Sequence, residues 1–296
     1  MPCASKWYNY FTNSSRLPKL TGGVILNEGT RCGAAPQSGQ NTAGPRPKVG
    51  LFVTCLVDLF RPNVGMAAVQ LLENAGCDVN VPEVQVCCGQ PAYNSGDTGS
   101  TREIAKQVIA AFEGFDYVVG PSGSCMATII KDYPKLFEED AAWQARAKSL
   151  ANRAHELLSF LSDVRGYEPR GIKLSGEATY HDSCSGLRSL GIKDQPRRLL
   201  SAVEGLNVRE MQDAETCCGF GGTFCVKYPA VSVKMADDKI ANASETGAHY
   251  VLGGDLGCLL NIAGRMSRQG RPADVYHTAE VLAGMTDTPA IGKPAK

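Results

Sequence analysis

The chain has 296 residues, of which 43% are hydrophobic and 20% are charged, and its 30 lysines and arginines balance its 30 aspartates and glutamates. This composition predicts a globular protein of one large or two medium domains, and the charge balance argues against a nucleic-acid-binding surface. Because no apolar run is long enough to span a bilayer and the amino terminus lacks a signal-peptide pattern, we expect a cytoplasmic protein without a membrane span.

Residues 1–47 are predicted to be a flexible, disordered tail. Glycine, proline, serine, asparagine and glutamine dominate the second half of this segment, which cannot bury enough apolar surface to fold. Cys3 and Cys32 lie in this tail, and we expect neither to take part in a functional site.

Residues 48–172 are predicted to form a first unit in which strands and helices alternate. The unit opens with the apolar run "KVGLFVTC", which is typical of a buried strand, and its first helix stops at Gly76. A further helix over 143–164 closes the unit. The expected strands are 48–55, 78–86 and 115–120, and the other expected helices are 63–76, 101–114 and 125–137.

Residues 173–287 repeat this order element by element, and 288–296 are expected to be a C-terminal tail. The expected strands of this second unit are 177–184, 206–212 and 248–253, and the expected helices are 195–205, 230–247 and 259–266. The repeat predicts an α/β fold of two tandem pseudo-repeated units, each a small parallel sheet flanked by helices.

Twelve cysteines are the unusual feature of the composition. Cytosolic thiols are kept reduced, so metal binding or redox chemistry explains them better than a disulfide framework does. Their spacing repeats with the units. From the first cysteine to a Cys-Cys pair there are 32 residues (55 to 87) and then 33 (184 to 217), and from the pair to the last cysteine there are 37 (88 to 125) and then 40 (218 to 258).

In each unit these cysteines follow a strand or open a helix. The carboxyl ends of parallel strands lie at one edge of the sheet, where α/β folds bind ligands, so the cysteines of a unit should meet there. Four thiolates are the usual complement of an iron–sulfur cluster or a structural zinc ion. The predicted metal ligands are Cys55, Cys87, Cys88 and Cys125 at one site and Cys184, Cys217, Cys218 and Cys258 at the other.

The tripeptide Cys-Cys-Gly occurs in both units. Adjacent side chains of an extended chain point to opposite sides, so the backbone must kink for both thiolates to reach one site. Gly89 and Gly219 can adopt a positive φ at little cost and leave room for a bulky inorganic centre. Backbone amides of these loops can then approach the sulfurs, and we predict that both glycines belong to cofactor-binding loops.

Other residues close to these motifs have simpler explanations. Cys77 is expected to be a small buried apolar residue, and Cys225 a packed thiol rather than a ligand. His181 is expected at the rim of the second site or as an outer neighbour of its ligands. Arg61 is expected to be a solvated loop residue or a helix cap.

The motifs "VCCGQPAYNSGD", "PSGSC", "YHDSCSGLR", "TCCGFGGTFCVKYP" and "GCLLNIAG" together resemble the cysteine-rich CCG domain family. Its members include the cysteine-rich subunit of heterodisulfide reductase and the iron–sulfur subunit of glycolate oxidase. The resemblance extends over about residues 48–285 and is closest to the lactate-utilisation branch of the family.

The resemblance implies an iron–sulfur subunit, with one or two clusters of the 4Fe-4S type, in a complex that oxidises L-lactate to pyruvate. The implied partners are a ferredoxin-like iron–sulfur protein and a third lactate-utilisation protein. The family pattern also has a cysteine three residues before the last cysteine of each unit, where this sequence has Ser122 and Asp255. The sites are therefore expected either to have four thiolates or to be completed by oxygens of Ser122 and Asp255.

Other functions stay open at this point. A zinc-binding scaffold, or zinc at one of the two sites, fits four thiolates as well as iron does. The substrate of the complex could be another 2-hydroxy acid, such as glycolate. A self-contained oxidoreductase is disfavoured because no G-x-G-x-x-G motif follows a predicted strand, so we assign no catalytic residue and expect the chain not to be catalytic alone.

Overall fold

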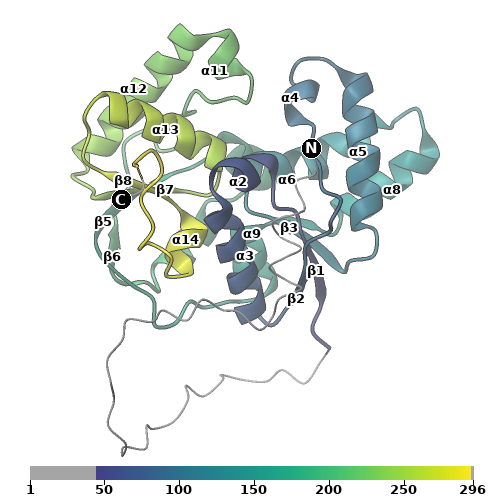
Figure 1. Ribbon diagram of the computed structural model, residues 1–296, viewed down its shortest axis with the longest axis horizontal. Helices are drawn as coiled ribbons and strands as arrows, with labels where there is room; N and C mark the ends of the chain where they lie inside the picture. Colours follow the sequence, from purple (N-terminus) through teal and green to yellow (C-terminus); the bar gives the residue numbers. More distant parts are fainter. Residues whose placement is uncertain (1–44, 295–296) are drawn as a thin grey trace, which may run out of the picture.

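The computed structural model describes residues 45–294, so most of the predicted N-terminal tail, with Cys3 and Cys32, lies outside the described residues. The described chain contains two four-stranded sheets, each entirely parallel and each flanked by helices (Figure 1). The prediction of an α/β fold with two pseudo-repeated units is confirmed. No described helix combines the length and apolar character that crossing a bilayer requires.

The two sheets have the same strand order. The first sheet is ordered β2-β1-β3-β4 and the second β6-β5-β7-β8, so each strand of one unit has a counterpart in the other. The strands are β1 (Lys48–Leu51), β2 (Asp78–Asn80), β3 (Tyr117–Gly120), β4 (Ala154–Glu156), β5 (Lys173–His181), β6 (Glu204–Val208), β7 (Tyr250–Gly253) and β8 (Asp274–His277).

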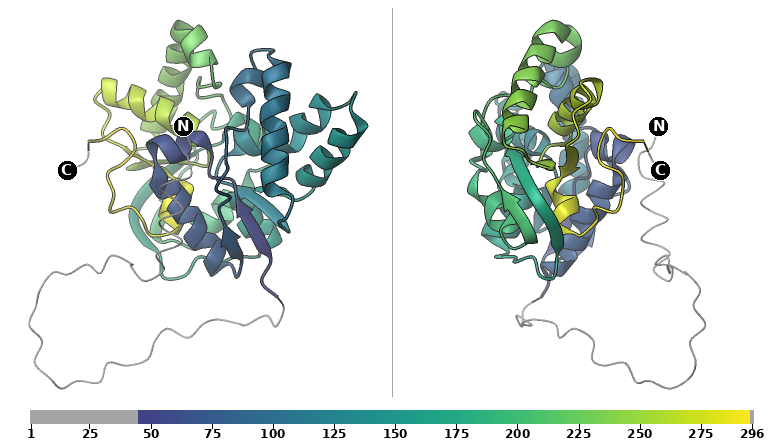
Figure 2. Two further views of the ribbon diagram at one scale, coloured as in Figure 1. Left: turned by 45° about the vertical axis from the view of Figure 1, so that its right-hand side comes forward. Right: turned by 90° about the vertical axis from the view of Figure 1, so that its left-hand side faces the viewer.

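Helices follow the strands in both units, and a helical pair of each unit projects from the same side of the molecule, α4 and α5 from one and α11 and α12 from the other (Figure 2). The helices of the first unit are α2 (Cys55–Phe60), α3 (Pro62–Asn74), α4 (Gln90–Tyr93), α5 (Thr98–Phe112), α6 (Gly123–Ala127), α7 (Tyr133–Leu136), α8 (Ala141–Ala151) and α9 (Leu157–Ser159), with π-helical turns η1 (Thr128–Asp132) and η2 (Phe160–Val164). The second unit has the π-helical turn η3 (Ser185–Ser189) and helices α10 (Asp194–Leu200), α11 (Phe224–Lys227), α12 (Pro229–Glu245), α13 (Leu256–Arg268) and α14 (Thr278–Leu282).

The fourth strand of each sheet differs from the prediction. The single helix expected over 143–164 is wrong, because α8 ends at Ala151 and β4 follows it. Three residues of β4 pair with β3, with Ala154 opposite Val118. Pairing at the sheet edge thus overrides the helical pattern of the local sequence. In the second unit, β8 and α14 have the same places as β4 and α9 and were not predicted.

One hydrophobic core joins the two units. The larger cluster of buried side chains extends from Leu71 in α3 to Val251 in β7 and Leu282 in α14. At its edge the Arg61 guanidinium donates to the fully buried Glu280 carboxylate over 2.8 Å, and to the carbonyl of Pro289 over 2.6 Å. Of the two alternatives expected for Arg61, the solvated loop residue is wrong, because Arg61 pairs with a buried carboxylate of the other unit. The helix cap is confirmed, since Arg61 is the capping residue between α2 and α3.

A second carboxylate, Glu156, is buried where the units meet. One of its oxygens accepts a hydrogen bond from the Ser159 amide at 3.0 Å, and the other has no partner among the described residues. Burial raises the pKa of Glu156 to about 7. The folded protein therefore holds this proton at pH values where the unfolded chain releases it.

We expect Glu156→Gln to remove a pH dependence of stability. The pKa is near 4.5 in the unfolded chain and about 7 in the folded one, so the wild-type free energy of unfolding should fall by roughly 3 kcal/mol as the pH rises between these values. Glutamine keeps the bond to Ser159 without a titrating proton. Urea unfolding should show the variant more stable than wild type at pH 8 and nearly equal at pH 4.5. The exposed Glu103→Gln is the control, and an equal difference at both pH values would contradict the prediction.

Candidate metal centres

The structure brings the first predicted cysteine set together. Cys55 is the first residue of α2, Cys125 lies in α6, and Cys87 and Cys88 lie in the loop before α4. The Cys55 thiol donates to the Cys87 sulfur over 3.7 Å, and the Cys88 side chain is within hydrogen-bond reach of both Cys87 and Cys125. Four sulfurs from three segments of the chain therefore form one continuous group.

The second set forms the corresponding group in the other unit. Cys184 follows β5, Cys217 and Cys218 lie in the loop before α11, and Cys258 lies in α13. Side-chain contacts run from Cys184 to Cys217, from Cys217 to Cys218 and from Cys218 to Cys258. None of the ten cysteines in the described residues is in a disulfide. The ligation of a metal by these eight thiols stays a prediction.

Charge is distributed unevenly within the first group. Donation by the Cys55 thiol, followed by donation from the Cys88 thiol and the Gly89 amide, lowers the pKa of Cys87 to about 3. The same bond to Cys87 raises the pKa of Cys55, and contacts with Cys125 and Cys87 raise that of Cys88. The group thus holds one thiolate readily, and a cation is required to stabilise further thiolates beside it.

The two Cys-Cys-Gly loops have the kinked backbone that the sequence predicted. Gly89 has a φ of 82° and Gly219 a φ of 84°. Their amides donate to the sulfurs of Cys87 and Cys217 over 3.5 and 3.4 Å. These donors favour a negative charge on the sulfur and are of the type that tunes an iron–sulfur potential.

The absent side chains of these glycines make room for a helix. A Cβ on Gly89 would lie 3.3 Å from the Ile104 side chain in α5, and a Cβ on Gly219 would lie 2.6 Å from the Ser232 carbonyl in α12. Neither nearest neighbour is a cysteine sulfur. The loops are therefore held close against α5 and α12, and the glycines act on the site through their backbone.

Two hydrogen bonds that the sequence did not indicate fix the backbone carbonyls of the Cys-Cys-Gly loops. The Tyr133 hydroxyl donates to the Cys88 carbonyl over 2.8 Å, and the Asn261 amide donates to the Cys218 carbonyl over 2.9 Å. Both donors come from the helical segment that follows the last cysteine of their unit. Tyr133 is eight residues after Cys125 and Asn261 is three residues after Cys258, so the repeated spacing does not predict them.

Ser122 and Asp255 lie where the two units meet. Each caps a helix, Ser122 by accepting from the Cys125 amide and Asp255 by accepting from the Gly257 amide. Both are buried, and the Ser122 hydroxyl donates to the Asp255 carboxylate over 3.1 Å. The Ser124 amide donates to the same carboxylate oxygen over 2.9 Å. These two residues therefore link the units, and their predicted part in ligation stays a prediction.

The backbones that carry the two sites touch each other. Gly123 lies two residues before Cys125, and Gly186 lies two residues after Cys184. A Cβ on Gly123 would be only 2.9 Å from the Gly186 Cα. One end of the first site thus lies against one end of the second, across a contact between two glycines.

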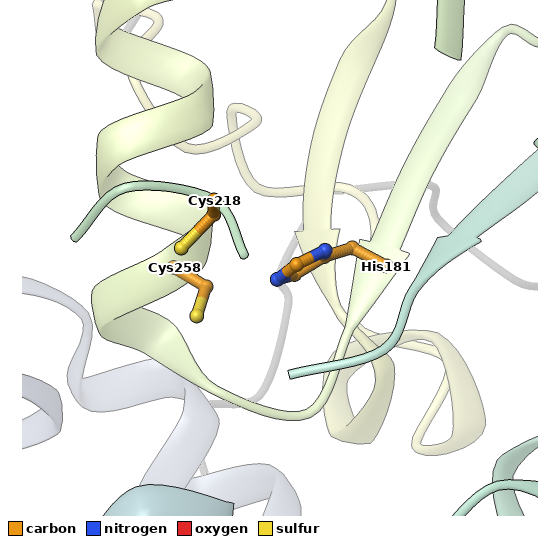
Figure 3. A group of neighbouring side chains, drawn as sticks. All are labelled: His181, Cys218 and Cys258. Carbon is orange, nitrogen blue, oxygen red and sulfur yellow. The ribbon is translucent and has the colours of Figure 1, made fainter. Parts of the chain in front are cut away.

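His181 lies deeper than expected. It is the last residue of β5 and only 1% exposed, so it is not at the rim of the site. A ring nitrogen and the sulfurs of Cys218 and Cys258 all lie within 4.8 Å of one another, and Figure 3 shows the ring pointing toward the two sulfurs. Burial, and then the nearby Lys239 ammonium, lower the pKa of His181 to about 3, which leaves the imidazole neutral.

The two remaining described cysteines have other surroundings. Cys77 is fully buried in the core, as predicted. Cys225 is half-buried, and its thiol donates to the Gly222 carbonyl over 3.4 Å.

The donor chemistry of both groups fits a thiophilic metal. Thiolates select zinc and iron–sulfur clusters over hard cations such as magnesium. Most of the grouped sulfurs are half-buried, whereas Cys88, Cys218 and Cys258 are buried. Each group therefore has an inner part enclosed by protein and an outer part that a cluster could fill.

Comparison with known proteins places the chain in a family. A model of the cysteine-rich domain named CCG matches residues 49–130 and again 178–263. A protein named lactate utilization protein A from Geobacillus sp. (strain WCH70) is 52% identical over 235 residues, which is 79% of this chain and 98% of that protein. The protein of the same name from Geobacillus kaustophilus is 54% identical with the same coverage. The chain belongs to the cysteine-rich CCG domain family, in the group of lactate utilization protein A, as its motifs predicted.

A solved structure supports the fold alone. The crystal structure of a hypothetical protein from Helicobacter pylori superposes with a TM-score of 0.60 at 10% identity. The superposition includes 85% of this chain and 53% of that one. At this identity the likeness concerns the arrangement of strands and helices.

We expect Gly219→Ala to be more damaging than Gly89→Ala. The left-handed backbone alone should cost either alanine roughly 1–2 kcal/mol. At Gly219 the new Cβ would also be 2.6 Å from a backbone oxygen, whereas at Gly89 it would meet the movable Ile104 side chain at 3.3 Å. Urea unfolding of the two variants measures the difference. Equal losses of stability would show that α12 moves away as easily as a side chain does.

Proposed function

We propose that this chain is an iron–sulfur electron-transfer subunit of a system that oxidises L-lactate to pyruvate. The observation that carries the proposal is the convergence of eight thiols into two groups of four, one in each unit. Family membership supports lactate as the substrate of the system, because the relatives are named for lactate utilisation.

The protein's own residues have clear parts in this proposal. Cys55, Cys87, Cys88 and Cys125 would hold one centre, and their counterparts in the second unit the other. A bound cluster would accept and release single electrons. The amides of Gly89 and Gly219 stabilise negative charge on the neighbouring sulfurs, and the close contact of Gly123 with Gly186 keeps the two centres adjacent.

The charged residues beside the second site support a role in electron transfer rather than in the oxidation of lactate itself. Oxidation of a 2-hydroxy acid requires a cationic clamp for the carboxylate, a base and a two-electron acceptor. The pocket beside Cys184 contains Arg188, Lys193 and Arg197. Two of these are already paired, Lys193 with Glu215 and Arg197 with two carboxylates. We therefore propose that a ferredoxin-like protein and a third lactate-utilisation protein complete the system.

The first test is lactate-dependent reduction. The chain, purified anaerobically with iron and sulfide bound, should show bleaching of its brown absorbance on addition of L-lactate only when both partner proteins are present. Glycolate in place of lactate tests the alternative substrate. Pyruvate formation by this chain alone, with an artificial one-electron acceptor, would make it the catalytic subunit and overturn the relay proposal. A colourless protein that contains only zinc would support the scaffold alternative.

The second test separates the two sites. Cys87→Ala should remove metal from the first site only, and Cys217→Ala from the second only, because each thiol contacts cysteines of its own unit. Iron, sulfide and zinc analysis of each variant should show loss of one site's content. Cys77→Ala is the matched control, since Cys77 is buried and the charged groups that act on its thiol are Arg165 and Arg46, with no other cysteine among them. Loss of all metal from one folded variant would contradict two independent sites.

A further inference from the structure

The internal repeat permits a comparison of the two sites position by position. Three residues before the first cysteine of its unit, the first site has Phe52 and the second has His181. The helices that pack against the two Cys-Cys-Gly loops, α5 and α12, can be aligned by the residues that contact the glycines. Thr101 lies against Gly89 and Ser232 lies against Gly219, so these two residues correspond.

In this alignment the position of Val108 in α5 corresponds to that of Lys239 in α12. Phe52 and Val108 are buried apolar residues, and Phe52 packs edge-on against Phe112 with ring centroids 5.8 Å apart. His181 and Lys239 are equally buried. The second site therefore has an imidazole and an ammonium where the first has only hydrocarbon.

The imidazole of His181 lacks hydrogen bonds. Neither ring nitrogen has a partner among the described residues, although the side chain is 1% exposed. Burial of a polar group without a partner is costly, on the order of 1–3 kcal/mol in proteins. By contrast the other buried histidine, His277, has its Nε2 against the Pro121 carbonyl at 3.2 Å and its Nδ1 accepting from the Ala279 amide at 3.2 Å.

The free nitrogen points at two sulfurs. Cys218 and Cys258 reach His181 from the loop before α11 and from α13, and one atom of each residue lies within 4.8 Å of the others (Figure 3). Ligands of a tetrahedral zinc ion, with metal distances of about 2.0–2.3 Å, would be roughly 3.5–3.8 Å apart. The three donors thus require only small movements to bind one metal.

Lys239 supplies a positive charge at the same place. Its ammonium donates to the carbonyls of Asp213 and Ala214, which fixes it inside the protein. It lies near Cys217, Cys218 and His181. A positive charge is therefore buried beside the second site, whereas the corresponding Val108 of the first site carries none.

We propose that His181 is a nitrogen ligand of the metal in the second site, beside Cys218 and Cys258, so that this site is a mixed imidazole–thiolate centre and the first is an all-thiolate one. The inference rests on the proposed function, because it requires that the second site holds metal. Where the imidazole binds the metal in place of one of the four thiolates, a neutral ligand replaces a negative one and the potential of an iron–sulfur centre rises. The two centres would then differ in potential, with the second the better electron acceptor.

The experiment detects the nitrogen directly. The full chain is produced with ¹⁵N-labelled histidine and loaded anaerobically with iron and sulfide, and hyperfine spectroscopy of its paramagnetic state reports a histidine nitrogen on iron. A second sample is loaded with Zn²⁺ alone, and X-ray absorption at the zinc edge reports nitrogen and sulfur neighbours. Each measurement is made on wild type, Cys87→Ala, Cys217→Ala, His181→Phe and the exposed His249→Ala.

We expect the nitrogen signal in wild type, Cys87→Ala and His249→Ala, and its loss in Cys217→Ala and His181→Phe. His181→Phe copies the residue of the first site, and its second-site metal affinity should fall roughly 100-fold, since loss of an outer partner alone costs 10- to 100-fold. If His181→Phe does not fold, the histidine nitrogen signal of wild type and of Cys87→Ala still tests whether a histidine binds the second-site metal. Second-site metal without a histidine nitrogen overturns this inference and leaves the proposed function standing. A second site that binds neither iron nor zinc overturns both.

Discussion

Repulsion between neighbouring thiolates is the constraint on which the rest of this structure depends. Four ionised sulfurs in partly buried surroundings are unfavourable without a cation. In the first site the structure relieves this with a single readily formed thiolate at Cys87, to which the Cys55 thiol and the Gly89 amide donate. Cys55 and Cys88 have raised pKa values and keep their protons. The kinked loops, the held carbonyls and the parallel strand ends all serve to keep these sulfurs together.

The contact between the units determines how the two sites relate. Ser122 and Asp255 have the positions where the family pattern has a further cysteine, and in this chain they bond to each other across the boundary. Arg61 and Glu280 form a second polar link at the edge of the shared core. The carboxylates of Asp255 and Glu280 are buried, so loss of the partner would leave either of them uncompensated. These contacts join the units where the backbones of the two sites approach each other.

The two units share one architecture but differ in the residues at their sites, and the ligands that we propose for each site follow from both facts. Strand order, glycine conformation and the four-thiol grouping are common to both units. In each unit these features bring four cysteine sulfurs together from separate segments of the chain. One difference lies at the inner wall of each site, where Phe52 and Val108 correspond to His181 and Lys239. Under the proposed relay function, two centres of unequal potential would give electron flow a direction, and two equal centres would not.

The sequence by itself determined the repeated α/β units, the division of eight cysteines into two sets and the left-handed glycines, because these depend on local periodicity, spacing and residue type. The tertiary structure decided what depends on partners distant in sequence. Strand β4 forms in a locally helical pattern because β3 offers its edge. Ser122 meets Asp255, Arg61 meets Glu280, and His181 turns inward to two sulfurs for the same reason. No local pattern encodes the identity of a side chain that packing brings from a distant part of the chain.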